Sequence, residues 1–370
     1  MDRVPALLLL VLSLAQAQGP QDFDRLFARA VELHQAGDIL GAIDTYKAAL
    51  TIAPERADAL SNLGAAYVRL GQFDDAVAQY EAALKVEPMN NSVRLNLALA
   101  FYKSARPAQA IPQLKRVLAS DPEAKNAYLI LADCYLQSGQ DKEVIGLLKP
   151  REQMFGADLA YAYLLGTALL YSGDTAEGQK YVDRVFGAGE SAEAHLLLGI
   201  AMLARQDFRG ARDELQRAIQ LNPKLPTANS LHGRTLRALG DHDNAERAFR
   251  RELDLNVNDF EANLQMGNLR KDQQKFAEAS TYLERATTIR PEDLVARKLL
   301  ASLRLQTGRT DEAVTMLEAL VKEAPEMVEA HVMLATGYNR LKRKDDAARE
   351  QAIIDKLNAQ IQAKQKGGGE

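Results

Sequence analysis

Histidine and cysteine are the residue types that most often bind metals or act as nucleophiles, and both are scarce in this sequence. The five histidines are His34, His195, His232, His242 and His331. None has the H-E-x-x-H or H-x-E spacing that places two ligands on one face of a helix. Cys134 is the single cysteine, so the chain can form neither an internal disulfide nor a cysteine-based metal site. We expect Cys134 to be a small, buried packing residue.

One short cluster, Asp241-His242-Asp243, has side chains that could bind a metal ion. In the repeat described below, however, it occupies the turn between two helices, in the same register as Gln72-Phe73-Asp74. The acid pairs Asp74-Asp75 and Asp345-Asp346 open helices, where solvated negative charge is favourable. No G-x-S-x-G nucleophile motif, phosphate-binding glycine loop or G-x-G-x-x-G fingerprint is present. We therefore predict a protein that is not an enzyme, with no catalytic residue, no metal and no cofactor.

The first seventeen residues have the pattern of a secretory signal peptide. Arg3 supplies a basic start, Leu7 to Leu12 is an unbroken apolar run, and Ala15-Gln16-Ala17 is an A-x-A cleavage site, which predicts cleavage between Ala17 and Gln18. The run is shorter than the roughly 20 residues that span a bilayer. We expect an exported, soluble mature protein, periplasmic or secreted, without a transmembrane segment. The alternative is an uncleaved leader that anchors the chain.

The overall charge argues against a nucleic-acid-binding protein. The chain has 46 Lys and Arg residues against 50 Asp and Glu residues, which gives a net charge of −4. Nucleic-acid-binding domains normally carry a strongly basic surface. We therefore expect protein partners and no nucleic acid.

A repeated unit organises almost the whole chain, and Ala57 to Asn90 illustrates it. Numbering this unit from 1 to 34, apolar or small residues fall at positions 4, 7, 8 and 11, which is the spacing of one helix face. Gly71 then ends the first helix, since glycine tolerates the left-handed conformation found there. A second apolar stripe follows Asp74-Asp75, and Pro88 closes the unit because proline cannot continue a helix.

The same register recurs ten times, with a spacing of 34 residues at every step except one of 33. The units begin at Phe23, Ala57, Asn91, Lys125, Leu159, Ala192, Pro226, Phe260, Leu294 and Val328. Position 8 is glycine or alanine in every unit, which predicts that the two helices of each hairpin approach closely there.

This pattern resembles the tetratricopeptide repeat family in its 34-residue period, in the segment Leu63-Gly64-Ala65-Ala66-Tyr67 and in the later alanine, aromatic and proline positions. The resemblance implies an all-α fold, an α-solenoid of about ten helix-turn-helix hairpins that forms a right-handed superhelix. It also implies a concave face, lined by the first helices, that binds peptides or protein segments. The tryptophan that the family has at position 4 is missing from every unit.

The register divides the chain into four parts: signal peptide 1–17, units 1–4 over residues 23–158, units 5–10 with a C-terminal capping helix over residues 159–361, and a frayed tail at 362–370. The fourth unit is irregular, because Pro150 should end its second helix near Lys149. We expect either a hinge or a longer immobile loop at 150–158. In the third unit, Pro107 suits a helix start, and Pro112 should bend that helix or shift its start.

The resemblance places positions 2, 5, 9, 12 and 13 of each first helix on the concave face, and we call these the groove positions. In units three to six they are largely apolar and in units seven to ten they are polar and mildly basic. The candidate binding residues are Leu95, Leu99, Tyr102, Leu129, Leu136, Tyr163, Leu170, Tyr171, Leu196, Ile200, Leu203, Arg234 and Arg237.

These candidates favour an exported scaffold or adaptor that binds a peptide or an amphipathic helix of a partner protein. One alternative is that some of the apolar side chains pack against each other, and another is that the groove carries a lipid or other apolar ligand. The family's clamp for a C-terminal carboxylate needs Lys at position 5 and Asn at position 9, and no unit has both.

Overall fold

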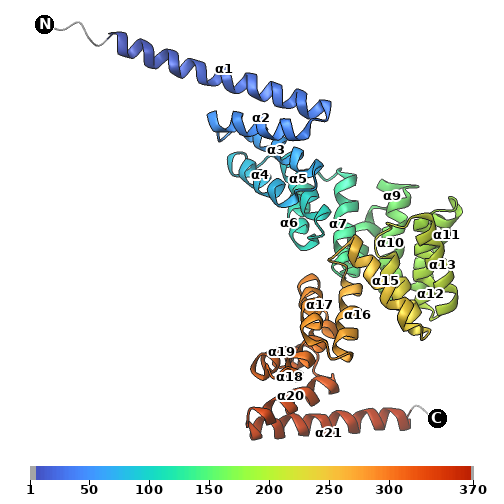
Figure 1. Ribbon diagram of the computed structural model, residues 1–370. Helices are drawn as coiled ribbons and strands as arrows, with labels where there is room; N and C mark the ends of the chain where they lie inside the picture. The colour runs from blue at the N-terminus through green and yellow to red at the C-terminus, as the bar shows by residue number, and fades with distance from the viewer. Residues whose placement is uncertain (1–5, 368–370) are drawn as a thin grey trace. The chain divides into compact units, whose positions relative to one another are not determined.

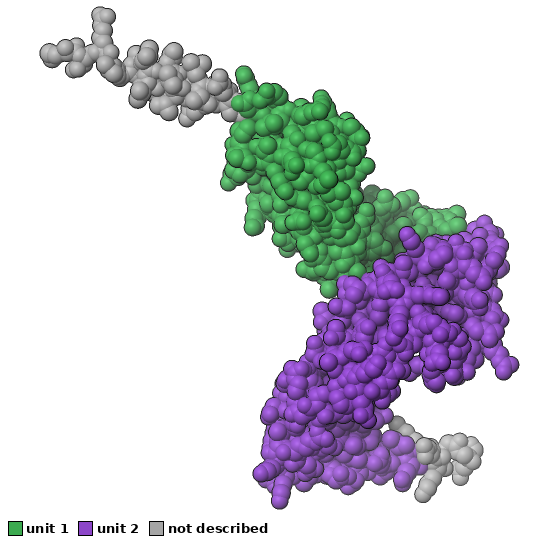
Figure 2. All heavy atoms as spheres, viewed as in Figure 1, with its two compact units in different colours: residues 1–165 green, residues 166–370 purple. Residues whose placement is uncertain are grey.

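A computed structural model describes the backbone of residues 6–367 and the side chains of residues 21–363, and it is helical throughout this part of the chain, with no strand (Figure 1). The chain forms two compact units, residues 1–165 and residues 166–370, which Figure 2 colours separately. They are called unit 1 and unit 2 below, whereas a repeat is named by its ordinal, as in the fourth unit. The α-solenoid predicted from the sequence is confirmed, since helices alternate as antiparallel hairpins along each unit.

The helices of unit 1 are α1 (Ala6–Ala36), α2 (Ile39–Ile52), α3 (Ala57–Arg69), α4 (Phe73–Val86), α5 (Asn91–Lys103), α6 (Pro107–Ser120), α7 (Lys125–Gln137), α8 (Asp141–Leu148), the 3-10 helix η1 (Lys149–Arg151) and α9 (Glu152–Phe155). Helix α10 (Leu159–Tyr171) contains the division between the units. Those of unit 2 are α11 (Thr175–Gly187), α12 (Ala192–Ala204), α13 (Phe208–Leu221), α14 (Ala228–Ala238), α15 (His242–Leu255), α16 (Phe260–Asp272), α17 (Phe276–Ile289), α18 (Leu294–Gln306), α19 (Thr310–Glu323), α20 (Val328–Arg340) and α21 (Lys344–Gly367).

The repeat register predicts where the first helices begin. Eight of them start at the first residue of their unit: α3, α5, α7, α10, α12, α16, α18 and α20. Helix α14 begins at Ala228 instead of Pro226, because Thr227 has a left-handed backbone with φ +64°. Helix α1 begins at Ala6, well before Phe23.

The small residue at position 8 is needed for close helix packing, as predicted. A Cβ added to Gly64 would lie 2.8 Å from the ring of Tyr80, and one added to Gly233 would lie 2.7 Å from the ring of Phe249. In both hairpins the close neighbour is the residue at position 24 of the second helix. A side chain at position 8 would therefore push the two helices apart.

Every first helix is followed by a residue with positive φ at position 15 of its repeat. Six of these residues are glycines, and four are not: Ala105, Gln206, Gln274 and Lys342, with φ between 54° and 60°. The left-handed residue lets the chain reverse into the second helix within two or three residues. The predicted role of Gly71, with φ +72°, is thus confirmed and extends to all ten hairpins.

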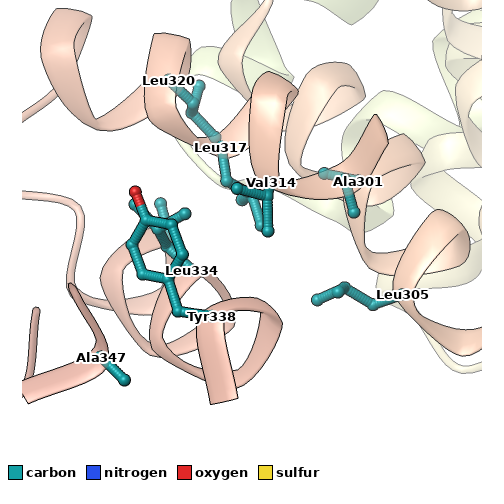
Figure 3. Packing of buried hydrophobic residues seen from close by; sticks show 10 residues of the cluster. Ala301, Leu305, Val314, Leu317, Leu320, Leu334, Tyr338 and Ala347 are labelled. Atoms are coloured by element: carbon teal, nitrogen blue, oxygen red, sulfur yellow. The ribbon is translucent and has the colours of Figure 1, made fainter. Parts of the chain in front are cut away.

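Buried apolar side chains from successive hairpins form the core. In Figure 3, Val314 and Leu317 of α19 lie between Leu305 of α18 and Leu334 and Tyr338 of α20. Each second helix therefore packs against the first helix of its own hairpin and against that of the next. This arrangement buries the apolar stripe that a single hairpin would leave exposed.

Polar side chains at position 4 connect the two helices of several hairpins. His195 Nδ1 lies 2.6 Å from Glu214 Oε2, His331 Nδ1 lies 2.6 Å from Glu350 Oε2, and Arg94 Nη1 donates to Gln113 Oε1 at 3.1 Å. The partner is at position 23 in each case. Both histidines are buried, and a hydrogen bond to the second helix satisfies each ring.

The irregular fourth unit has the predicted helix end, since α8 stops at Leu148. Residues 149–155 continue as η1 and the one-turn helix α9, and Gly156 then turns the chain with φ +50° and ψ −117°. Pro107 is the first residue of α6, as predicted, so Pro112 does not shift the start of that helix.

Both ends of the chain extend the hairpin array. The side chains of the predicted leader and of the cleavage site at Ala17 and Gln18 lie outside the described residues, as does the whole of residues 1–5. Helix α21 continues to Gly367, beyond residue 361, and residues 368–370 of the predicted tail are not described. Among the described residues, no helix combines the length and the apolar character needed to cross a bilayer.

Candidate partner-binding surface

The groove positions are brought together by contacts between successive first helices. In unit 1, α1 contacts α3, α3 contacts α5 and α5 contacts α7. In unit 2 the same holds along α12, α14, α16, α18 and α20. Because the register repeats from helix to helix, the groove positions form a row within each unit.

Most of the candidates in unit 1 keep part of their surface exposed. Leu95, Leu99, Tyr102, Leu129 and Tyr163 are half-buried. Leu136 is only 8% exposed and belongs to the core. Leucine and tyrosine side chains from α5, α7 and α10 therefore remain accessible in part, as a docking surface requires.

A half-buried carboxylate, that of Asp133, lies at a groove position of α7. The Tyr102 hydroxyl of α5 donates a hydrogen bond to Asp133 Oδ2 of α7, and Gln137 Nε2 donates to the same oxygen at 3.0 Å. No Lys or Arg of the described residues forms an ion pair with Asp133. The carboxylate is thus held by neutral donors from two helices.

Burial dominates the electrostatics of this cluster. Burial raises the pKa of Asp133, while the hydrogen bonds from Tyr102 and Gln137 lower it. Burial and then the charge of Asp133 raise the pKa of the Tyr102 phenol. The same two causes raise the pKa of Cys134 to about 12, so this thiol is a buried packing residue, as expected, and not a nucleophile.

Asp133 and Gln137 were missed by the sequence analysis. They occupy groove positions 9 and 13 of the fourth unit, but only large apolar side chains were selected there. The description of the groove positions in units three to six as largely apolar is corrected accordingly, because α7 holds a carboxylate at one of them. A polar residue at position 9 between apolar neighbours was the signal that could have identified it.

In unit 2, three apolar candidates belong to the core, and not to an accessible face. Leu170, Leu196 and Ile200 are 4%, 0% and 2% exposed. A Cβ added to Gly178 would lie 2.9 Å from Leu170 Cγ, so α11 packs closely over that leucine. Helix α12 is apolar on all sides and is enclosed by α11, α13 and α14.

The remaining candidates of unit 2 are accessible. Leu203 is half-buried and Tyr171 is 41% exposed. Arg234 is half-buried and Arg237 is exposed, both on α14. The two arginines make the part of this face on α14 basic.

Asp241-His242-Asp243 starts a helix. Asp241 is the N-cap of α15 and accepts a hydrogen bond from the Asn244 backbone N–H at 3.3 Å. Hydrogen bonds from the side chain and backbone of Asn244 lower the pKa of Asp241. Among the described residues, no group of three His, Cys, Asp or Glu side chains is arranged to hold a metal ion.

A buried acid cluster joins three helices of unit 2. Glu252 of α15 accepts hydrogen bonds from the backbone N–H groups of Thr227 at 2.8 Å and Asn229 at 3.1 Å. It caps α14, whose N-cap Thr227 makes no side-chain capping bond. Asp259 caps α16 through the Ala262 N–H at 2.7 Å. Burial, followed by the charge of Glu252, raises the pKa of Asp259 to about 7. This cluster serves packing and not ligand binding.

Comparison with known proteins identifies the repeat. Two sequence profiles, each described as tetratricopeptide repeat, match the chain, one over residues 33–100 and 270–334 and the other over residues 95–143, 163–226 and 230–293. No curated protein matches the sequence.

Among solved structures, a chain in the crystal structure of the APC/C hetero-tetramer Cut9-Hcn1 is similar, with a TM-score of 0.57 and 18% sequence identity. The similarity covers 91% of this chain and 75% of that chain. At this level of identity it shows a common helical-repeat fold.

Proposed function

The chain belongs to the tetratricopeptide repeat family, and from this premise we propose that it is an exported scaffold or adaptor that binds peptide or helix segments of partner proteins. The observation that carries the proposal is that leucines and tyrosines at the groove positions of α5, α7 and α10 are half-buried and not enclosed in the core. Apolar surface that is grouped on one face and kept partly open supports binding of a protein segment.

The chemistry of the surface in unit 1 favours a particular kind of segment. Leu95, Leu99 and Leu129 offer apolar contacts, and Asp133, one helical turn after Leu129, has two neutral donors and no cation among the described residues. A donor on the partner would add a charge-assisted hydrogen bond to this carboxylate. We therefore propose that the bound segment is mainly apolar and places one donor, such as a Lys or Arg side chain, against Asp133.

The burial of the apolar candidates weighs against the alternative, a carrier of an apolar ligand. Leu136, Leu170, Leu196 and Ile200 are in the core, so they cannot line a cavity for a lipid. The apolar side chains that remain accessible alternate with polar ones, which suits a protein segment better than an acyl chain.

Two substitutions test the binding surface. Leu99→Ser together with Leu129→Ser removes apolar contacts from the groove positions, and the matched control is Leu40→Ser together with Met89→Ser, at positions 68% and 85% exposed outside the groove. We expect the groove variant to recover at least about fivefold less partner from native extracts, since each lost apolar contact weakens binding by about 1 kcal/mol or more. Equal recovery by both variants, with unchanged helicity, contradicts the proposal.

Export is part of the proposal and has its own test. Its basis is the leader pattern at residues 1–17. The N-terminal sequence of the protein purified from its native host should begin at Gln18. An intact N-terminus in a cytosolic fraction would contradict export and leave the binding proposal unaffected.

A further inference from the structure

Cations on α14, α16 and α18 fall into two groups, and the first group is paired. Arg270 of α16, whose side chain is 4% exposed, bonds Glu246 at 2.9 Å and Glu278 at 2.8 Å. Arg297 and Arg304 of α18 are likewise paired with glutamates of α17 and α19. These arginines are at positions 4 and 11, which face the second helices.

The second group has no partner among the residues that the structure describes. It consists of Arg234 and Arg237 of α14, Lys271 of α16 and Lys298 of α18, and we call it the basic stripe. Among the described residues, none of these four side chains makes an ion pair or a hydrogen bond. All four are at groove positions 5, 9 or 12. The face of the helix on which a cation lies therefore decides whether it forms an ion pair, since the adjacent residues Arg270 and Lys271 belong to different groups.

The unpaired charges of the stripe favour an anionic partner. Arg234, Lys271 and Lys298 are half-buried, Arg237 is exposed, and none of the four forms an ion pair among the described residues. Neighbouring acids do not compensate. Glu261 accepts a hydrogen bond from Gln265 at 2.9 Å, and Asp272 is exposed in the last turn of α16. The groove positions of α14, α16 and α18 thus hold four cations against two acids.

We propose that the basic stripe is the docking site of an acidic protein segment, an inference that rests on the proposed function and specifies one of its partners. The carboxylates of such a segment would complete the ion pairs that the stripe lacks. Lys298 is followed by Ser302 and not by Asn at position 9, so recognition is of acidic side chains and not of a chain-terminal carboxylate.

Nucleic acid fits the stripe less well than a peptide. The groove positions of α14, α16 and α18 contain no aromatic residue on which a base could stack. Val295 of α18 and Val332 of α20, at neighbouring groove positions, are 49% and 46% exposed and offer apolar contacts that a peptide can use. The net charge of −4 also repels a polyanion as long as RNA.

The helix geometry predicts the spacing of the acids. Packed helices lie about 10 Å apart, and an extended peptide rises about 3.3 Å per residue. A segment that crosses from α14 to α18 should therefore carry an acid at about every third residue. A peptide with Glu at every third position and small polar residues between is the appropriate probe.

Fluorescence anisotropy with this peptide and the full chain tests the proposal. Arg237→Gln with Lys271→Gln should weaken binding about tenfold, which corresponds to about 1.4 kcal/mol. Arg209→Gln with Lys224→Gln is the control, because both residues are exposed in unit 2, carry no ion pair, lie outside the groove positions and give the same change in net charge. The control should bind as the unchanged protein does, and added salt should weaken binding in both.

Three results would overturn the proposal. They are equal loss of binding in the stripe and control variants, equal binding of a peptide with Lys in place of Glu, and tighter binding of a single-stranded RNA of the same length. If acidic peptides fail but Leu99→Ser with Leu129→Ser still reduces partner recovery, the proposed function stands and only the stripe is wrongly assigned.

Discussion

At the residue scale, the hydrogen bond between Tyr102 and Asp133 links α5 to α7 where a partner is proposed to bind. Tyr102→Phe removes one of the two donors to the half-buried carboxylate of Asp133. We expect the free energy of unfolding to fall by about 1–3 kcal/mol, the cost of leaving a buried acceptor poorly satisfied. Urea denaturation measures this fall in the free energy of unfolding. Tyr80→Phe is the control, because only burial shifts the pKa of the Tyr80 phenol. A loss equal to that of the control would contradict the role given to the bond.

The buried acid at Asp259 predicts a pH dependence of stability. Its pKa in the folded protein is about 7 against an ordinary value of 3.8, raised by burial, by Glu252 from α15 and by Glu261 from its own helix. A raised carboxyl pKa means that folding takes up a proton. The stability that the protonated form contributes is therefore present below pH 3.8 and is lost as the pH rises to about 7.

Asp259→Asn should remove this dependence, because the amide keeps an acceptor for the Ala262 N–H but does not ionise. Relative to the unchanged protein, the variant should gain stability from pH 5 to pH 7, by at most about 1.4 kcal/mol per pH unit. Denaturation midpoints at pH 5, 6, 7 and 8 measure the gain. Parallel midpoints across this range would show that Asp259 is charged in the folded protein.

Sequence reasoning predicted the packing roles of single residues better than their polar contacts. Gly64 was assigned to close helix packing from the register and Cys134 to the core from the usual burial of a free cysteine, and the structure confirms both. The bond from His195 to Glu214 spans 19 residues of sequence, and the burial of Asp133 depends on α5. Such contacts depend on which neighbour a side chain meets, and a one-dimensional pattern does not contain that information.

At the element scale, the left-handed turn at position 15 ends all ten first helices. Gln274 adopts φ +59° there, where a side chain is strained and glycine is not. We expect Gln274→Gly to raise the melting temperature by about 1–3 °C, since relief of left-handed strain outweighs the added freedom of the unfolded chain. Gly240→Ala, at φ +85° with open space around its Cβ, should lower it. Shifts of the same sign in the two variants would contradict the argument.

Element boundaries were largely predictable because glycine, proline and the helical period repeat at a fixed interval. The exception is α14, which begins two residues after Pro226 because Thr227 has a left-handed backbone. Glu252 from the second helix of the same hairpin caps α14 by accepting a hydrogen bond from the Thr227 N–H. A single sequence shows the proline but not the glutamate that caps the helix from 25 residues away. The repeat alone therefore does not predict that a residue of another helix caps α14.

At the scale of the whole molecule, repetition predicted the α-solenoid but not how its face is divided. Unit 1 combines leucines and tyrosines with a half-buried carboxylate, whereas unit 2 presents the basic stripe. The apolar candidates Leu196 and Ile200 could not be distinguished from Leu99 by sequence, because all three are aliphatic residues at groove positions. Only the enclosure of α12 by its neighbours separates them.

The central claim is that the groove positions bind a partner protein, and site-specific photo-cross-linking in the native host tests it most directly. A photoreactive amino acid would be placed at groove residues Leu99 and Lys271, and at the exposed outer residues Ala119 of α6 and Gln216 of α13 as controls. The account predicts discrete protein cross-links from the groove sites and none from the outer sites. Cross-links from the outer sites alone, or none from any site, would contradict it.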